Sequence, residues 1–171
     1  MLSRYAVVET RFGWMVMGGS DAGLRLLTLP RPSVKAVVAR IKASERAAVE
    51  DASAFGDLSF RLQRYFEGED VELSDKLDFG GGTDFGMAVW AATRSIPYGE
   101  TRSYSWVARL IGASKACRAV GSALGRNPLP IIVPCHRVIT SDGRLGGFGG
   151  GLEMKRLLLR LEAPGRPLGL A

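Results

Sequence analysis

A reactive thiol is the chemistry that this sequence offers most clearly. Residues 134–138 (PCHRV) place one of the two cysteines, Cys135, beside the only histidine, His136, and the cation Arg137. A thiolate is a far stronger nucleophile than a thiol, so a reacting cysteine needs a base or a positive field nearby. The run therefore predicts a nucleophilic Cys135 with His136 as its base. The alternative is a small buried cysteine beside a merely hydrogen-bonded histidine.

The adjacency of the two side chains raises a geometric difficulty. The apolar residues 131–133 predict a buried strand that leads into Cys135. Adjacent side chains of a strand point to opposite faces, so Cys135 and His136 cannot touch if the strand continues. Two solutions stay open: the chain bends at Pro134, or a water molecule carries the proton between the side chains.

Glu162 is the candidate for a third group. A histidine base needs a partner that holds its tautomer, as a carboxylate does in hydrolase triads. Residues 152–162 (LEMKRLLLRLE) have helical spacing, and Lys155 and Glu162 lie two turns apart on roughly one face. The helix dipole slightly disfavours a carboxylate in the last turn, which indicates a use for Glu162. The alternative is a solvated glutamate.

Length and composition bound the protein class. A chain of 171 residues suffices for one domain or two small ones, and 46% hydrophobic with 23% charged residues is typical of a globular protein. We expect no signal peptide and no membrane span. Two cysteines fit a reducing cytoplasm better than a disulfide framework. One histidine and two cysteines are too few for an ordinary structural zinc site, so we expect no metal.

The charge is unevenly distributed. Residues 1–79 contain 11 basic and 12 acidic side chains, a net charge of −1, whereas residues 80–171 contain 12 and 5, a net charge of +7. A basic half beside a neutral one favours a polyanionic partner. The alternative is a basic surface that serves solubility.

Local patterns predict two domains. β-Favouring stretches at 4–8, 12–18 and 24–29 predict a small antiparallel sheet, followed by helices at 33–43 and about 53–67. The glycines at 80–82 are the best candidate for a linker. We therefore expect a domain at 1–79 and a second at 80–171.

The second domain is predicted to be mostly helical. After a helix from Thr83 or Asp84 to about Ser95, residues 101–125 suggest helix, turn, helix, with Ser103 and Ser114 as the caps. The second of these helices is rich in small residues, which allow close approach to another helix or to a nucleic-acid groove. Basic residues lie on or near it: Lys115, Arg118 and Arg126.

The combined motifs resemble those of the O6-alkylguanine-DNA alkyltransferase family, the methylated-DNA–protein-cysteine methyltransferases. The resemblance covers roughly residues 83–162 and is weak upstream, where it consists mainly of residues 65–68. The matching segments, at the family's spacing, are VW at 89–90, IPYGET at 96–101, SY at 103–104, RNP at 126–128, PIIVPCHRV at 130–138, GGF at 146–148, GGL at 150–152, Lys155 and Glu162.

The resemblance implies a role for each matching residue. Cys135 would accept the alkyl group, His136 would take its proton through a water molecule, and Glu162 would orient His136. Asn127 would brace the turn beside the active-site strand, and Tyr104 would donate a proton to the departing guanine.

The resemblance also implies how DNA is bound. Arg118 would fill the space of the flipped nucleotide while the small-faced helix lies in the minor groove. The residues implied at the substrate are Arg118, Val138, Gly147, Phe148 and Lys155. Those implied at the DNA are Ser114, Lys115, Arg118, Ser122 and Arg126.

The implied protein is a single-turnover DNA repair enzyme. It would transfer the alkyl group of O6-alkylguanine, and less well that of O4-alkylthymine, from double-stranded DNA to Cys135, as a cytoplasmic monomer without a cofactor. The implied fold is α+β: a small ribonuclease H-like N-terminal domain with an antiparallel sheet and helices, then a mostly helical domain that contains a helix-turn-helix and Cys135.

Some positions depart from the family pattern, and rival functions exist. The zinc ligands of some members are absent, Phe148 replaces a tyrosine, Gly149 replaces a serine, and Cys117 is expected to be packed and unreactive. A damage-recognition protein of similar fold would lack the acceptor cysteine. A transcription regulator would not need Cys135, His136 and Glu162 together, and a cysteine hydrolase would ignore DNA.

Overall fold

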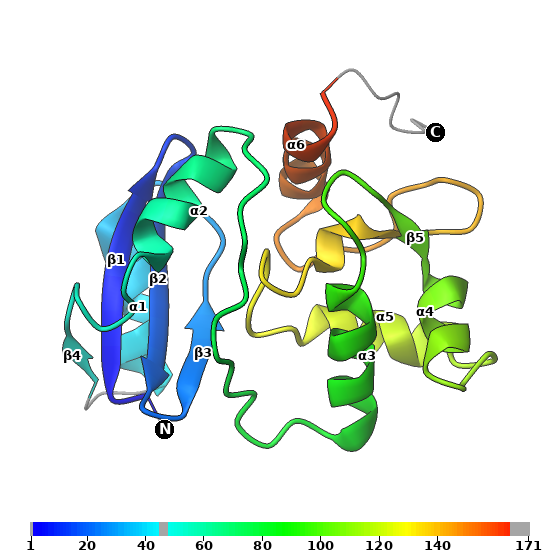
Figure 1. Cartoon of the computed structure of the whole chain (residues 1–171), viewed down its shortest axis with the longest axis horizontal. Coiled ribbons are helices and arrows are strands. Elements are labelled where there is room, and N and C mark those ends of the chain that lie inside the picture. Colours follow the sequence, from blue (N-terminus) through cyan, green and yellow to red (C-terminus); the bar gives the residue numbers. More distant parts are fainter. Residues whose placement is uncertain (1, 45–47, 165–171) are drawn as a thin grey trace. The chain divides into compact units, whose positions relative to one another are not determined.

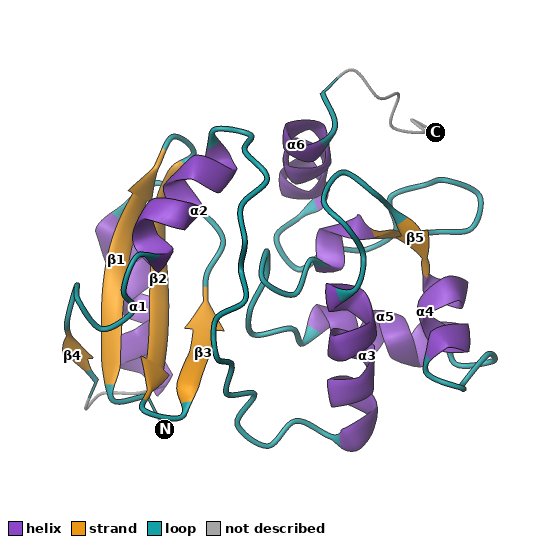
Figure 2. Cartoon of the chain, viewed as in Figure 1, coloured by secondary structure: helices purple, strands orange, loops and turns teal. Residues whose placement is uncertain are grey.

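The computed structural model of the chain describes residues 2–44 and 48–164. Two compact units, Met1–Gly80 and Gly81–Ala171, make up the chain, and each is described by itself. The architecture is α+β, with a sheet and helices in the first unit and mostly helices in the second (Figure 2). Within the described residues, no helix is both long and apolar enough to cross a membrane.

The first unit is built on a four-stranded sheet (Figure 1). Strands β1 (Arg4–Thr10), β2 (Gly13–Ser20) and β3 (Gly23–Leu27) form the predicted antiparallel arrangement. A fourth strand, β4 (Val49–Glu50), adds beside β1 in parallel, so the order is β3-β2-β1-β4. The predicted antiparallel pairing of three strands is confirmed, and the parallel strand β4 was not predicted, because two exposed residues carry no pattern that could reveal a strand.

Two helices pack on this sheet. Helix α1 (Val34–Ser44) contributes buried Val37 and Ile41, which cluster with Tyr5 and Val16 of the strands. Helix α2 (Leu58–Phe66) also packs on β1 and buries Leu58, Leu62, Tyr65 and Phe66. It begins later than the predicted residue 53 because residues 52–57 form turns. The unit thus has an apolar core of strands and helices.

The second unit is mostly helical, as predicted. Its elements are α3 (Asp84–Arg94), β5 (Arg102–Ser103), α4 (Tyr104–Leu110), α5 (Cys117–Gly125), the 3₁₀ turn η1 (Cys135–Arg137), β6 (Val138–Ile139) and α6 (Leu152–Glu162). The short strands β5 and β6 pair in parallel. The predicted caps of α3 and α4 are confirmed, since Thr83 accepts a hydrogen bond from Gly86 N and Ser103 from Trp106 N.

Helix α5 differs from its prediction at its start. It begins at Cys117, and Ala116 rather than Ser114 is its N-cap residue. Residues before it form a turn instead, in which Ala116 N bonds Ala113 O. Behind α5, the indole Nε1 of Trp90 on α3 donates to Ala123 O at 3.0 Å in a buried contact. This bond fixes α5 against α3 on the side that buries Val120, Ala123 and Leu124, whereas Arg118, Ala119 and Ser122 are exposed.

Candidate active site

Cys135 lies on an irregular buried segment and not on the predicted strand. Residues 131–138 are all buried, but Ile131 has φ +79° and Cys135 opens the 3₁₀ turn η1 after Pro134. Prolines lack the N–H that a strand ladder needs, and three of them between 128 and 134 prevent a continuous strand. The chain thus bends at Pro134, the first of the two solutions left open by the sequence, and this bend is compatible with the second, a water molecule between the two side chains.

Asn127 ties this segment together. Its Nδ2 donates to Val133 O at 2.9 Å and to Cys135 Sγ at 3.2 Å. Its Oδ1 accepts a hydrogen bond from Leu129 N at 2.9 Å. One amide side chain therefore holds both ends of the bend and contacts the thiol directly.

The Cys135 thiol is buried and needs help to ionise. Only 7% of the residue is exposed, and this burial raises the pKa of the thiol above its ordinary value. The hydrogen bond from Asn127 and the charge of Lys155 act in the opposite direction but are outweighed. A thiol with a raised pKa is protonated near neutrality, so nucleophilic attack by Cys135 requires a base.

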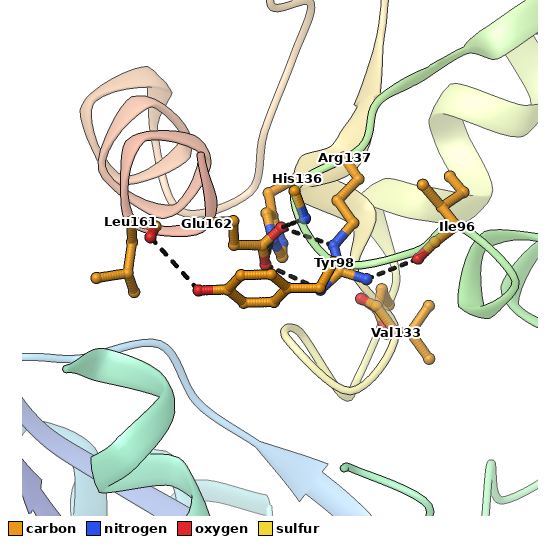
Figure 3. Close-up of polar contacts among 9 residues, drawn as sticks. Ile96, Tyr98, Val133, His136, Arg137, Leu161 and Glu162 are labelled. Atoms are coloured by element: carbon orange, nitrogen blue, oxygen red, sulfur yellow. Dashed lines mark hydrogen bonds and ion pairs between the residues drawn. The ribbon is translucent and has the colours of Figure 1, made fainter. Parts of the chain in front are cut away.

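His136 and Arg137, which follow Cys135 in the chain, form a buried cluster with Glu162 (Figure 3). His136 Nε2 lies 2.7 Å from Glu162 Oε1. Arg137 donates from Nε to Glu162 Oε2 at 2.8 Å and from Nη2 to Glu162 Oε1 at 2.9 Å. The structure thus brings together the histidine and the glutamate that the sequence proposed as partners, and adds the arginine to them.

The surroundings of the cluster lower the pKa values of both Glu162 and His136. Burial raises the pKa of Glu162, but hydrogen bonds with His136 and Arg137 outweigh it and lower the pKa to about 2. Burial lowers the pKa of His136 more strongly than Glu162 raises it. The resting cluster therefore contains a carboxylate and a neutral imidazole, and a neutral imidazole can accept a proton.

The loop before β5 fixes the position of Glu162. Gly99 N donates to Glu162 Oε2 at 3.3 Å, and Tyr98 Oη donates to Leu161 O at 3.4 Å. Gly99 has φ +73°, and a Cβ there would lie 3.0 Å from Glu162 O. Glycine is required for both reasons, since other residues rarely adopt this conformation. The end of α6 is thereby held beside η1.

Lys155, which the resemblance places at the substrate, bonds to backbone carbonyls. Its side chain is fully buried, and Nζ donates to Val138 O at 2.7 Å, to Gly147 O at 3.3 Å and, at shorter range, to Leu145 O. Burial lowers its pKa to about 8 although Cys135 acts to raise it. Lys155 therefore holds the backbone of the glycine-rich segment, and does not line the cavity described next.

Cys135 lines a cavity of about 810 Å³. The cavity is bounded by α4, α5 and the glycine-rich segment, and its lining residues are Tyr104, Ser105, Cys117, Arg118, Gly121, Ser122, Leu124, Gly125, Cys135, Thr140, Ser141, Gly146, Gly147, Phe148 and Gly149. Cavities of roughly 300–1,000 Å³ are typical of small-molecule sites. A nucleophile that opens onto such a space can react with a group delivered there.

Tyr104 forms part of one wall of the cavity. Its Oη donates to Gly147 O at 3.3 Å, and its ring packs within 4 Å of the positions that side chains at Gly121 and Gly146 would occupy. Burial and the nearby Cys135 raise the pKa of the phenol, which therefore keeps its proton. The wall thus supplies a hydroxyl donor near the thiol.

The predicted site residues divide into three groups. Six line the cavity: Tyr104, Arg118, Ser122, Cys135, Gly147 and Phe148. Five lie outside its lining and are partly or fully buried: Asn127, His136, Val138, Lys155 and Glu162. Three are exposed before and after α5 and do not line the cavity: Ser114, Lys115 and Arg126.

Sequence reasoning missed several lining residues. Ser105, Thr140 and Ser141 place hydroxyl groups at the cavity, and Ser105 Oγ lies 3.1 Å from Ser141 Oγ. Serines and threonines in turns are common for local reasons, so only their meeting across α4 and β6 could have revealed them. Cys117, expected to be packed, is partly exposed and lines the same cavity.

Comparison with known proteins identifies the family. Residues 84–164 match the family described as 6-O-methylguanine DNA methyltransferase, DNA binding domain. The methylated-DNA–protein-cysteine methyltransferase of Methanosarcina acetivorans is 41% identical over 162 residues, which is 92% of this chain and 97% of that protein. The chain belongs to the methylated-DNA–protein-cysteine methyltransferase family. A methyltransferase of Mycolicibacterium paratuberculosis is 42% identical over 97% of this chain and 96% of its own length.

Solved structures of methyltransferases share the fold. The crystal structure of Mycobacterium tuberculosis OGT in complex with DNA has a TM-score of 0.81, with 42% identity over 95% of this chain and 96% of that chain. The O6-methylguanine-DNA methyltransferase of Pyrococcus kodakaraensis has a TM-score of 0.71 at 25% identity. Within residues 2–44 and 48–164, no group of three or more His, Cys, Asp and Glu side chains is arranged to hold a metal ion.

Proposed function

We propose that this protein repairs double-stranded DNA by moving the alkyl group of O6-alkylguanine, and less well that of O4-alkylthymine, onto Cys135. The observation that carries the proposal is the position of Cys135, which opens onto the 810 Å³ cavity while His136 and Glu162 lie buried beside it. Family membership and the DNA complex of the mycobacterial relative support the same conclusion.

The proposed reaction is a direct displacement. His136 takes the thiol proton through a water molecule, and because Nε2 faces Glu162, Nδ1 is the nitrogen that would receive it. The thiolate attacks the alkyl carbon, the carbon–oxygen bond breaks, and its electron pair moves onto the guanine. Tyr104, which rests on Gly147 O, would turn to protonate the base as it leaves. The thioether product is stable, so each molecule would react once.

The substrate base must leave the helix to reach Cys135, because the stacked duplex hides its O6 group. We propose that α4, the following turn and α5 act as a helix-turn-helix, with α5 in the minor groove. Small residues on α5 and its exposed Arg118 support this proposal, since Arg118 also lines the cavity and can fill the vacated space. Ser114, Lys115, Ser122 and Arg126 would contact the DNA backbone.

The remaining roles follow from the placement of the residues. Asn127 would orient the thiol, while Gly147 and Phe148 would contact the base. Val138 and Lys155 would act by holding the cavity wall and not by touching the substrate. We assign the first unit a structural role and a ribonuclease H-like fold, for which the order β3-β2-β1-β4 is the supporting feature. A cytoplasmic monomer that needs no cofactor completes the proposal.

Intact-protein mass tests the reaction directly. After incubation with duplex DNA that contains one O6-methylguanine, we expect one methyl group per chain, located on Cys135, and no further gain. Cys135→Ser should bind the DNA and gain no mass, whereas Cys117→Ser, the matched control, should react like the wild type. Tight DNA binding without mass gain in the wild type would instead indicate a damage-recognition protein.

Arg118→Ala tests the extrusion of the base. The variant should slow transfer from duplex DNA by at least about tenfold relative to transfer from the free modified base, because only the duplex requires the vacated space to be filled. Arg126→Ala, the control, should weaken DNA affinity and reduce its salt dependence by about one unit, as a lost phosphate contact does. Equal slowing by Arg118→Ala on both substrates would contradict the proposed insertion.

A further inference from the structure

Arg137 makes more hydrogen bonds than a residue that only supplies a positive charge near the thiol would need. All three of its nitrogens have partners: Nε and Nη2 form a two-point fork on the Glu162 carboxylate, and Nη1 donates to Ile96 O at 2.7 Å (Figure 3). Its guanidinium lies 5.7 Å from the ring centre of Tyr98. Only 9% of the residue is exposed. The side chain therefore has one defined orientation, and this orientation is directed at Glu162.

The fork determines which way the carboxylate faces. Planar guanidinium and carboxylate groups joined by two parallel bonds cannot rotate relative to each other without losing one bond. Oε1 accepts from Arg137 and also faces His136 Nε2 at 2.7 Å. The plane of Glu162, and through it the tautomer and ring orientation of His136, therefore depend on Arg137. The sequence alone suggested that Arg137 serves the thiol, but its contacts are with the carboxylate.

We propose that Arg137 is a positioning residue of the transfer reaction: it aligns Glu162 toward His136 and neutralises the carboxylate charge, so that His136 stays an unprotonated base. The role in transfer rests on the proposed function, whereas the titration of His136 that tests the effect of Arg137 does not. In a triad with an unpaired carboxylate, the negative charge stabilises the imidazolium. Here the Arg137 charge offsets it, and the basicity of His136 is reduced.

The other groups around His136 do not replace this effect. Among the residues that the structure describes, titratable groups near the cluster include Lys155 on α6, Cys135 in the same turn, and Tyr98 on the loop that holds Glu162. Lys155 is a cation as well, but its Nζ bonds go to backbone carbonyls and not to the carboxylate. Helix α3 also packs against η1, and its buried residues are uncharged: Gly86, Val89, Trp90, Ala92 and Thr93.

The chain has a single histidine, so its protonation can be followed without ambiguity. We would label histidine with ¹⁵N and titrate the wild type, Arg137→Gln, Arg137→Lys and the exposed control Arg160→Gln by NMR. In Arg137→Gln we expect the His136 ring to protonate at a higher pH than in the wild type. Arg137→Lys keeps the charge and should titrate near the wild type, as should Arg160→Gln. An unchanged His136 titration in Arg137→Gln would overturn the proposal.

Transfer from a duplex with one O6-methylguanine gives the second measurement, at saturating protein and across pH. Below the pH at which His136 loses its proton, Arg137→Gln should react about tenfold more slowly, the change that a one-unit displacement of the acid limb produces. At high pH its rate should approach that of Arg137→Lys, which keeps the charge but loses the two-point fork and so reacts more slowly than the wild type at every pH. A merely structural defect would instead lower the rate equally at every pH. Arg137→Lys keeps the test available if Arg137→Gln does not fold, because it should retain the limb and lose rate throughout.

The two experiments separate this inference from the proposed function. Absence of methyl transfer by the wild type would contradict the proposed function. The NMR titration would still decide whether Arg137 controls the protonation of His136.

Discussion

Two regions near Cys135 differ in composition. One is the buried cluster of His136, Arg137 and Glu162, and the other is the glycine-rich wall at residues 146–151. The cluster consists of charged and titratable side chains, each paired at 2.7–2.9 Å. The wall consists of five glycines and Phe148. Lys155 donates hydrogen bonds to Gly147 O in the wall and to Leu145 O just before it. Proton transfer needs specific side chains, whereas admitting a base needs space and backbone groups.

This difference predicts how each region responds to substitution. Removing one member of the cluster leaves a buried charge without its partner, which is costly. Changing the wall alters shape and backbone conformation, with smaller effects. The predictions below test this contrast, beginning with the largest expected effect.

Glu162→Gln should be the most damaging change in the cluster. It leaves Arg137 buried without its carboxylate, and breaking a buried pair in this way costs about 3–5 kcal/mol. Urea unfolding at pH 7 measures the loss. Glu153→Gln on the same helix is the control, since the Glu153 side chain is 90% exposed and its pair with Arg156 should contribute little. Equal unfolding free energies for Glu162→Gln and Glu153→Gln would contradict the large cost expected in the buried cluster.

The same carboxylate predicts a pH dependence of stability. The pKa of Glu162 is about 2 in the folded protein and about 4.3 in an unfolded chain. Ionised Glu162 therefore stabilises the fold above about pH 4.3, and this contribution is lost as the pH falls toward 2. Glu162→Gln should lack this part of the acid sensitivity in unfolding measurements between pH 5 and 2.5. A wild type and variant that lose stability in parallel would contradict it.

Lys155→Met should have an intermediate effect, because Lys155 acts on both regions. It removes a cation near Cys135 and leaves buried carbonyls unsatisfied, at a cost of about 1–3 kcal/mol. We expect alkyl transfer from the free modified base to Cys135 to slow by about tenfold or more. Lys115→Met is the control, because Lys115 is exposed and transfer from the free modified base needs no contact with a duplex. A rate equal to that of the control would mean that Lys155 has no part in the site.

Gly146→Ala should have the smallest effect of the three substitutions. Gly146 has φ +66°, and an added Cβ would lie 2.8 Å from Tyr104 Oη. We expect a loss of about 1–2 kcal/mol from the backbone conformation and slower transfer as Tyr104 is displaced. Gly147→Ala is the matched control for stability, since a Cβ there meets nothing within 4 Å. Equal unfolding free energies for the two variants would show that the wall yields to a methyl group.

Much of the fold could be predicted because its signals are local. Short β-favouring apolar stretches indicated β1 to β3, and capping residues such as Thr83 and Ser103 located the starts of α3 and α4. β4 was not predicted because two exposed residues form no pattern. The prediction of Ser114 as the N-cap of α5 was wrong because serine also favours turns. The strand expected before Cys135 was wrong because the prolines in that segment cannot support a ladder.

The sequence by itself singled out Cys135 as the candidate thiol, and His136 and Glu162 as partners, since few side chains can do this chemistry and their types and spacing are recognisable. Only the tertiary structure decided that Arg137 bonds to Glu162, and that Lys155 bonds to the backbone carbonyls of the wall. The physical reason is that a long charged side chain reaches in any direction. Its partner is chosen by burial and geometry, which depend on elements brought together from distant parts of the chain.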